Sequence, residues 1–185
     1  MNSLAERPLD AVASTLIAVA REAIAAGERP QPMQWPLDWL REPGASFVTL
    51  RMDGELRGCI GSVDARRPLG DDVAYNAYAA AYRDPRFAPL EKGELANLAV
   101  EVSVLSARVP FAAASEEGAL AALRPGVDGV YLEFDGTSAT FLPQVWENLP
   151  EPLDFLTELR RKAGLPPRFW SDRVKLSRYT VDKYK

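Results

Sequence analysis

The chain has 185 residues, of which 47% are hydrophobic and 26% charged, a balance typical of globular proteins. Its net charge of −4 argues against a dedicated nucleic-acid-binding protein, which usually carries a basic surplus on one face. The chain contains no histidine, which excludes Ser-His-Asp and Cys-His catalytic groups and histidine-based metal sites. Its one cysteine cannot form an intrachain disulfide or an all-cysteine metal site. We therefore expect no metal and no cofactor.

Charged residues and a predicted helix begin the chain. Glu6, Arg7 and Asp10 stand where a signal peptide would need an apolar core, and no apolar run approaches the ~20 residues that span a bilayer. We therefore expect a cytoplasmic protein without a membrane segment, and the sequence leaves its oligomeric state unknown. Apolar residues at helical spacing predict an amphipathic helix over 9–26, which Gly27 ends.

A hairpin, a helix and a strand are predicted next. Asp53-Gly54 between two alternating runs is typical of a two-residue hairpin turn. Pro68 suits the first turn of a helix, and Pro85 ends it because proline disfavours the helical conformation in the residue before it. The predicted ranges are 46–52 and 55–61 for the hairpin strands, 68–84 for the helix and 98–105 for the last strand.

The second half of the chain predicts the same order of elements. Ser115 caps a short helix that ends before Pro125. Asp135-Gly136 again separates two alternating runs. The predicted ranges that follow are 129–134 and 137–142 for the hairpin strands, 152–164 for a helix from Pro152 to Gly164, and 174–184 for one alternating strand.

An internal repeat explains this similarity. At an offset of 82, residues 46–87 match 128–169 at 11 of 42 positions, where about 3 matches are expected by chance. The matches fall on hairpin turns and helix ends, so we predict duplicated hairpin–helix–strand units of approximately 46–106 and 128–185 in a single domain spanning 1–185. The predicted fold class is α+β, with mainly antiparallel sheets flanked by helices.

The stretch LRGCIG contains the lone cysteine and occurs in the first repeat only. On a regular strand, Arg57 and Cys59 share one face, and an arginine beside a thiol favours the reactive thiolate. Gly58 and Gly61 allow a ligand or another backbone to approach closely. The alternative interpretation is that Cys59 is an inert small hydrophobe and that the glycines mark a bulge or tight packing.

Two carboxylates are weaker candidates for proton transfer. Glu101 points opposite the valines of its strand, although an exposed strand glutamate is the commoner case. Asp84 precedes a proline and is placed to pair with Arg86. Because Pro85-Arg86-Phe87 recurs at residues 167–169, we interpret that tripeptide as a structural helix stop.

The segments GASFVTLRMDGELRGCIGS, DPRF, EVSVL and LPQVWE, in this order, give the sequence a resemblance to the AMMECR family from about residue 10 to the C-terminus. The resemblance implies an α+β fold with an internal duplication. It also implies that bacterial and archaeal members act as the first component of a three-part system with a Memo-type protein and a radical-SAM protein. The functional surface that it implies consists of Leu56, Arg57, Gly58, Cys59, Ile60 and Gly61.

Two function hypotheses follow. In the one we favour, the chain is a binding or adaptor component that docks a Memo-type or radical-SAM partner through LRGCIG. In the other, it is an enzyme that modifies a small molecule: Cys59 acts as nucleophile or thiol acceptor, Arg57 orients an anionic group, and Glu101 or Asp84 moves protons.

Overall fold

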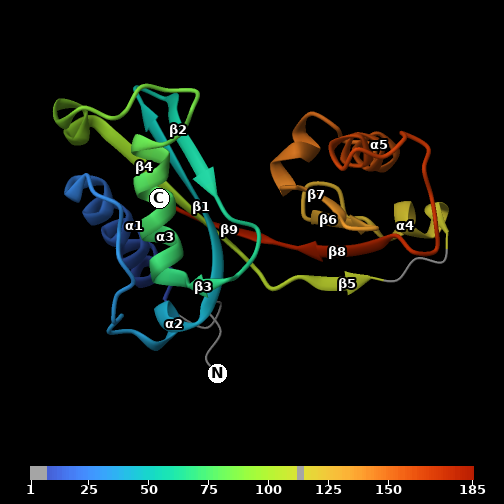
Figure 1. The fold of residues 1–185 in the computed structure, drawn as a ribbon, viewed down its shortest axis with the longest axis horizontal. Helices are drawn as coiled ribbons and strands as arrows, with labels where there is room; N and C mark the ends of the chain where they lie inside the picture. Colours follow the sequence, from blue (N-terminus) through green and yellow to red (C-terminus); the bar gives the residue numbers. More distant parts are fainter. Residues whose placement is uncertain (1–7, 112–114) are drawn as a thin grey trace. The chain divides into compact units, whose positions relative to one another are not determined.

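The computed structural model describes residues 8–111 and 115–185 and divides them into two compact units. The first unit extends to Leu105 and includes Asp182–Lys185, and the second comprises Ser106–Val181. Each unit combines helices with a sheet whose strands pair antiparallel, as Figure 1 shows. The predicted α+β fold class is confirmed.

A helix-covered sheet forms the first unit. The sheet has the order β2-β1-β4-β9, and β3 pairs with the beginning of β1. The elements are α1 (Leu9–Ala26), α2 (Asp38–Arg41), β1 (Pro43–Met52), β2 (Glu55–Gly61), β3 (Arg67–Pro68), α3 (Leu69–Tyr82), the 3₁₀ helix η2 (Lys92–Asn97), β4 (Leu98–Leu105) and β9 (Val181–Tyr184).

The core of the first unit lies on one face of this sheet. Val48 and Leu50 of β1 are fully buried, and they alternate with Phe47 and Thr49, which are partly exposed on the opposite face. α1 and α3 lie side by side over the buried face (Figure 1). Five of the eleven buried residues of α3 are alanines, whose small side chains let the helix backbone approach the sheet closely.

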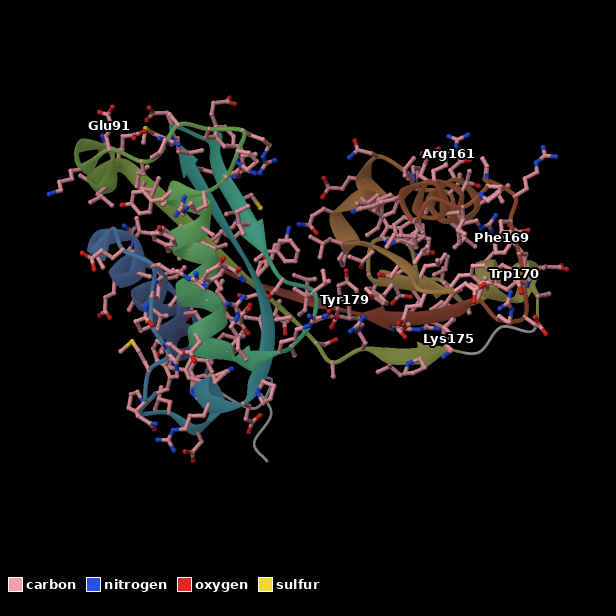
Figure 2. All side chains as sticks on the ribbon, viewed as in Figure 1. Glu91, Arg161, Phe169, Trp170, Lys175 and Tyr179 are labelled. Carbon is pink, nitrogen blue, oxygen red and sulfur yellow. The ribbon has the colours of Figure 1, made fainter. Side chains whose placement is uncertain are left out.

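In the second unit the sheet order is β5-β8-β6-β7. Its elements are β5 (Val109–Phe111), α4 (Glu116–Ala122), β6 (Gly129–Phe134), β7 (Thr137–Phe141), the 3₁₀ helix η3 (Pro143–Glu147), α5 (Pro152–Lys162) and β8 (Lys175–Tyr179). The core centres on Phe155 of α5, which stacks on Trp146 of η3 with ring centroids 3.8 Å apart. Tyr179, labelled in Figure 2, is also buried.

Both predicted hairpins are confirmed, and their turns have the same backbone geometry. Asp53 and Gly54 have φ angles of 50° and 85°, and Asp135 and Gly136 have φ angles of 48° and 84°. Two successive positive φ angles are the requirement of the tight turn whose twist matches antiparallel strands, and Asp-Gly satisfies it at low cost.

The strand order in the two sheets agrees with the predicted repeat. In each sheet the first hairpin strand is flanked by the second hairpin strand and by the strand that follows the helix: β2-β1-β4 in one and β7-β6-β8 in the other. A duplication event itself stays a prediction.

The prediction of one strand over 174–184 is wrong. The buried residues Leu176, Tyr179 and Tyr184 do not keep a strict alternation, and the hydrogen-bonding partner changes within the segment: β8 pairs with β6, whereas β9 belongs to the first sheet. The break falls at Thr180, whose N–H donates to Ser106 Oγ and whose carbonyl accepts from the Ser106 N–H. A periodic pattern records which side chains face the core but not which strand they pair with.

Asp72 anchors α3 to β1. A carboxylate in the first turn of a helix suits the helix dipole, but the Asp72 side chain is also buried and accepts hydrogen bonds from Ser46, Ser62, Arg67 and Asn76. The donors include the Ser46 main-chain N–H at 2.8 Å. Five donor groups on four neighbouring residues therefore share this one carboxylate.

The repeat supplies a matched control for this anchor, because the counterpart of Asp72 is Asp154, which is exposed at the start of α5. We predict that Asp72→Ala lowers the free energy of unfolding by about 3–5 kcal/mol, because it removes the acceptor of several buried donors and the ion-pair partner of Arg67. Asp154→Ala should cost less than about 1 kcal/mol. Urea denaturation measures both, and equal losses would contradict the anchoring role.

Candidate functional site

The segment Leu56–Gly61 lies on β2, the edge strand of the first sheet, and it contains a β-bulge. Leu50 of β1 pairs with Gly58, and the next residue, Arg51, pairs with Leu56, so Arg57 is the extra residue. The bulge interrupts the strict alternation of side chains along β2. The prediction that Arg57 lies beside the Cys59 thiol depended on that alternation.

Arg57 is bound away from the thiol, and that prediction is therefore wrong. Its Nε and Nη2 donate to the two carboxylate oxygens of Glu94 at 2.8 and 3.0 Å, and its Nη1 donates to the Ala88 carbonyl at 3.0 Å. The hydrogen bonds to Glu94 raise the pKa of Arg57, and they lower the pKa of Glu94. This guanidinium fastens β2 to the segment that precedes β4.

Glu94 is a residue of the site that the sequence analysis missed. Besides binding Arg57, it accepts the Glu91 main-chain N–H at 2.7 Å, and it thereby completes the capping box that starts η2. Figure 2 labels Glu91 on the segment that leads into η2. The available signal was a glutamate three residues after the helix cap, which is a capping-box spacing.

The two glycines are explained by packing within the protein. A Cβ at Gly58 would lie 2.1 Å from the Ala80 carbonyl oxygen of α3, and a Cβ at Gly61 would lie 2.2 Å from the Phe47 ring. Both distances are far inside van der Waals contact. The sequence predicted that a ligand or another backbone approaches these glycines. In the structure, the backbone of α3 approaches Gly58 and the ring of Phe47 approaches Gly61.

Asp84 and Arg86 hold the main chain of Cys59. The Cys59 N–H donates to Asp84 Oδ2 at 2.9 Å, and its carbonyl accepts from Arg86 Nη2 at 3.1 Å. The two side chains also form an ion pair of 2.7 Å, as the sequence predicted. The interpretation of Pro85-Arg86-Phe87 as a helix stop alone is incomplete, because Arg86 contacts the segment that carries the cysteine.

The charge of Asp84 is strongly stabilised. Hydrogen bonds from Arg86, joined by the Cys59 N–H and opposed by burial, hold the pKa of the Asp84 carboxyl well below its usual range. A carboxylate with so low a pKa is a poor proton acceptor at neutral pH. The geometry gives Asp84 a positioning task, and its part in proton transfer stays a prediction.

The Cys59 side chain lies on the face of the sheet opposite the helices and is partly exposed. Its sulfur is 3.4 Å from Thr49 Oγ1 on β1, and Thr49 in turn pairs with Glu101 on β4. We call Cys59, Thr49 and Glu101 the Cys59 row. With strands about 4.8 Å apart, the two ends of the row are separated by about 10 Å. Glu101 also pairs with Lys185 at 3.1 Å.

Leu56 and Ile60, the remaining predicted residues, differ in their surroundings. Ile60 packs against the hydrophobic core of the first unit, whereas Leu56 pairs with exposed Arg51 near the hairpin turn. Of the six residues in LRGCIG, Cys59 is therefore the one whose polar side chain lies on the open face, beside the Thr49 hydroxyl and outside any ion pair.

Within residues 8–111 and 115–185, no cluster of three or more Asp, Glu, Cys or His side chains is arranged to hold a metal ion. Across the same residues, no helix has both the length and the apolar character needed to cross a bilayer.

The packing explanation of Gly58 can be tested with a second glycine. Gly58→Ala should lower the free energy of unfolding by about 2–3 kcal/mol, because the added methyl overlaps the Ala80 carbonyl. Gly93 in η2 has open space at its Cβ position, so Gly93→Ala should change it by less than about 0.5 kcal/mol. Chemical denaturation compares the two, and a stable Gly58→Ala protein would refute the close approach.

Asp84 should make stability depend on pH. Its folded-state pKa lies below the unfolded value of about 3.9, so its contribution is complete above that value and declines as the pH falls toward the folded-state pKa. At about pH 6, Asp84→Asn should cost about 2–3 kcal/mol, and at about pH 2.5 the gap to wild type should narrow. Urea denaturation at both pH values measures the difference in the free energy of unfolding between the variant and wild type. A gap that does not change with pH would contradict the low pKa.

Comparison with known proteins shows similarity to one protein family. The AMMECR1 family model matches residues 17–184. A protein of Methanothermobacter thermautotrophicus is 39% identical over 166 residues, which cover 85% of this chain and 85% of that protein. A protein of Thermotoga maritima is 36% identical over 152 residues, covering 81% and 82% of the two chains.

A solved structure agrees with this match. The crystal structure of an uncharacterised protein of Pyrococcus horikoshii is 33% identical and has a TM-score of 0.77, covering 91% of this chain and 88% of that one. The family model spans nearly the whole chain, including the hairpin, the α3 helix and the Cys59 row. The chain therefore belongs to the AMMECR1 family.

Proposed function

We propose that the chain is a binding or adaptor component whose docking surface is the Cys59 row together with the LRGCIG strand β2. Its partners in this proposal are a Memo-type protein and a radical-SAM protein, and its location is the cytoplasm. The observation that carries the proposal is the clamping of β2 by two carboxylate–guanidinium pairs, Asp84–Arg86 and Arg57–Glu94.

Clamping favours binding because it holds the surface in one conformation before a partner arrives. Asp84 and Arg86 fix both main-chain groups of Cys59, and Glu94 fixes the side chain of Arg57. A surface that is already ordered loses less conformational entropy on association, so more of the contact energy appears as affinity. The partly exposed thiol and hydroxyl then stand on a rigid sheet face.

The same charges support catalysis less well. Asp84 is held ionised by Arg86, and Glu101 is paired with Lys185 about 10 Å from the cysteine across two strands. The hydrogen-bond neighbour of the thiol is the hydroxyl of Thr49, which is not a base, and Arg86, which interacts electrostatically with Cys59, is already paired with Asp84. A nucleophile is normally activated by a base or a cation within hydrogen-bond reach.

The proposed partners come from the family resemblance, and the docking surface can be tested directly. The purified chain would be mixed with the Memo-type and radical-SAM proteins of its own genome, and affinities measured by biolayer interferometry. We expect binding to at least one of them. Thr49→Lys, which places a long charged side chain in the Cys59 row, should weaken that binding at least about tenfold.

Thermal and urea unfolding would show that the variant is folded, with a loss below about 1 kcal/mol. The control is Ser138→Lys, an exposed position on β7 of the second unit, which should bind like wild type. Equal binding by Thr49→Lys and wild type would remove the Cys59 row from the docking surface, and the absence of binding to either protein would remove the proposed partners.

The alternative is an enzyme that uses Cys59 as nucleophile or thiol acceptor. It is favoured by one observation: a thiol, a hydroxyl and a carboxylate occupy one row on a partly exposed face. Mass spectrometry of the protein isolated from its own cells would separate the two functions. A small-molecule adduct on Cys59 supports the enzyme, and an unmodified Cys59 supports the binding component.

A further inference from the structure

β2 is the last strand on one side of the first sheet. In an antiparallel ladder, the N–H and C=O of every second residue point away from the paired strand. At Cys59 these groups are bound by Asp84 and Arg86 and so point outward, along the open edge. An edge with free main-chain groups is a template for another strand, and proteins block such edges with charged side chains or loops.

Asp84 and Arg86 together imitate the strand that could lie there. A carboxylate oxygen accepts the Cys59 N–H at 2.9 Å, as a strand carbonyl would. A guanidinium nitrogen donates to the Cys59 carbonyl at 3.1 Å, as a strand N–H would. We propose that the Asp84–Arg86 pair is an edge plug, and that β2 without this plug pairs antiparallel with β2 of a second copy of the chain.

A second copy is the natural occupant because the pairing is self-complementary. When two identical strands run antiparallel about a two-fold axis at Cys59, the N–H and C=O of this residue exchange hydrogen bonds with the same residue of the partner. The Cα atoms of two residues paired in this way are about 5.5 Å apart. That separation falls within the range of about 4.4–6.8 Å that a disulfide can bridge.

The edge of the second sheet is treated in a similar way. β7 is its last strand, and Lys162 of α5 donates from Nζ to the Thr140 carbonyl at 2.9 Å. In each unit a cation at or just beyond the end of a helix thus occupies an outward carbonyl of the edge strand. The inference does not depend on the proposed partners, and it implies that partners dock on the face of β2 and not along its edge.

The test uses a double variant, Asp84→Ala with Arg86→Ala, in the full chain. Its control is Asp64→Ala with Arg66→Ala, which removes an ion pair of the same i,i+2 spacing on the loop after β2, where Arg66 is largely exposed. Light scattering after size exclusion measures the mass of the reduced proteins. Diamide, which accepts two electrons and two protons as two thiols become a disulfide, then tests for a Cys59–Cys59 cross-link.

We expect the double variant to dimerise with increasing concentration and to cross-link at least about tenfold faster than wild type, while wild type and control stay monomeric. Since the chain has one cysteine, any disulfide dimer joins Cys59 to Cys59. If circular dichroism shows that the double variant is unfolded, Arg86→Ala alone uncovers the carbonyl and the same two measurements apply.

Three results would overturn the plug. One is a folded, monomeric variant that cross-links at the wild-type rate, since the ion pair would then serve only the local structure. Another is a dimer that does not cross-link through Cys59, which excludes pairing of β2 with β2. A wild-type protein that is already a β2-linked dimer contradicts it as well.

Discussion

A buried carboxylate beyond the end of α3 holds the edge of the first sheet in place. Asp84 joins the helix to β2 because it binds the Cys59 main chain and Arg86 at once. Its charge is tolerated in a buried position since every hydrogen bond that it accepts comes from an N–H, two of them from a guanidinium. The position of the cysteine, the closure of the edge and the rigidity of the proposed docking surface all depend on this arrangement.

The two units share an order of elements but stabilise it with different polar anchors. In the first, Asp72 ties β1 to α3 through buried serine, asparagine and arginine partners. In the second, the corresponding Asp154 is exposed, and a different buried carboxylate, Asp128, binds Arg124 and Arg178. Apolar patterning is thus common to both units, whereas the position and the partners of the buried carboxylate differ between them.

The LRGCIG segment contributes to packing and to the proposed docking surface through different atoms. Gly58 and Gly61 are small because Ala80 and the Phe47 ring press against them, so their presence is explained without a ligand. The Cys59 thiol has no such explanation, because its side chain lies on the open face beside Thr49 while the clamps act on its main chain. A motif can therefore be distinctive in sequence although, in the proposed function, Cys59 alone of its polar side chains is available to a partner.

The sequence alone determined both hairpins and the three longest helices, because alternation, Asp-Gly turns, Pro68 at a helix start and Gly27 at a helix end act through neighbours in the chain, but it did not show that residues 174–184 divide into two strands. It also identified Cys59 and the Asp84–Arg86 pair, whose members are two residues apart. Only the tertiary structure decided that Arg57 binds Glu94, 37 residues away, and not the thiol. The bulge displaces the alternation by one residue, and contacts between distant segments follow from how helix and strand meet in space, which no local pattern encodes.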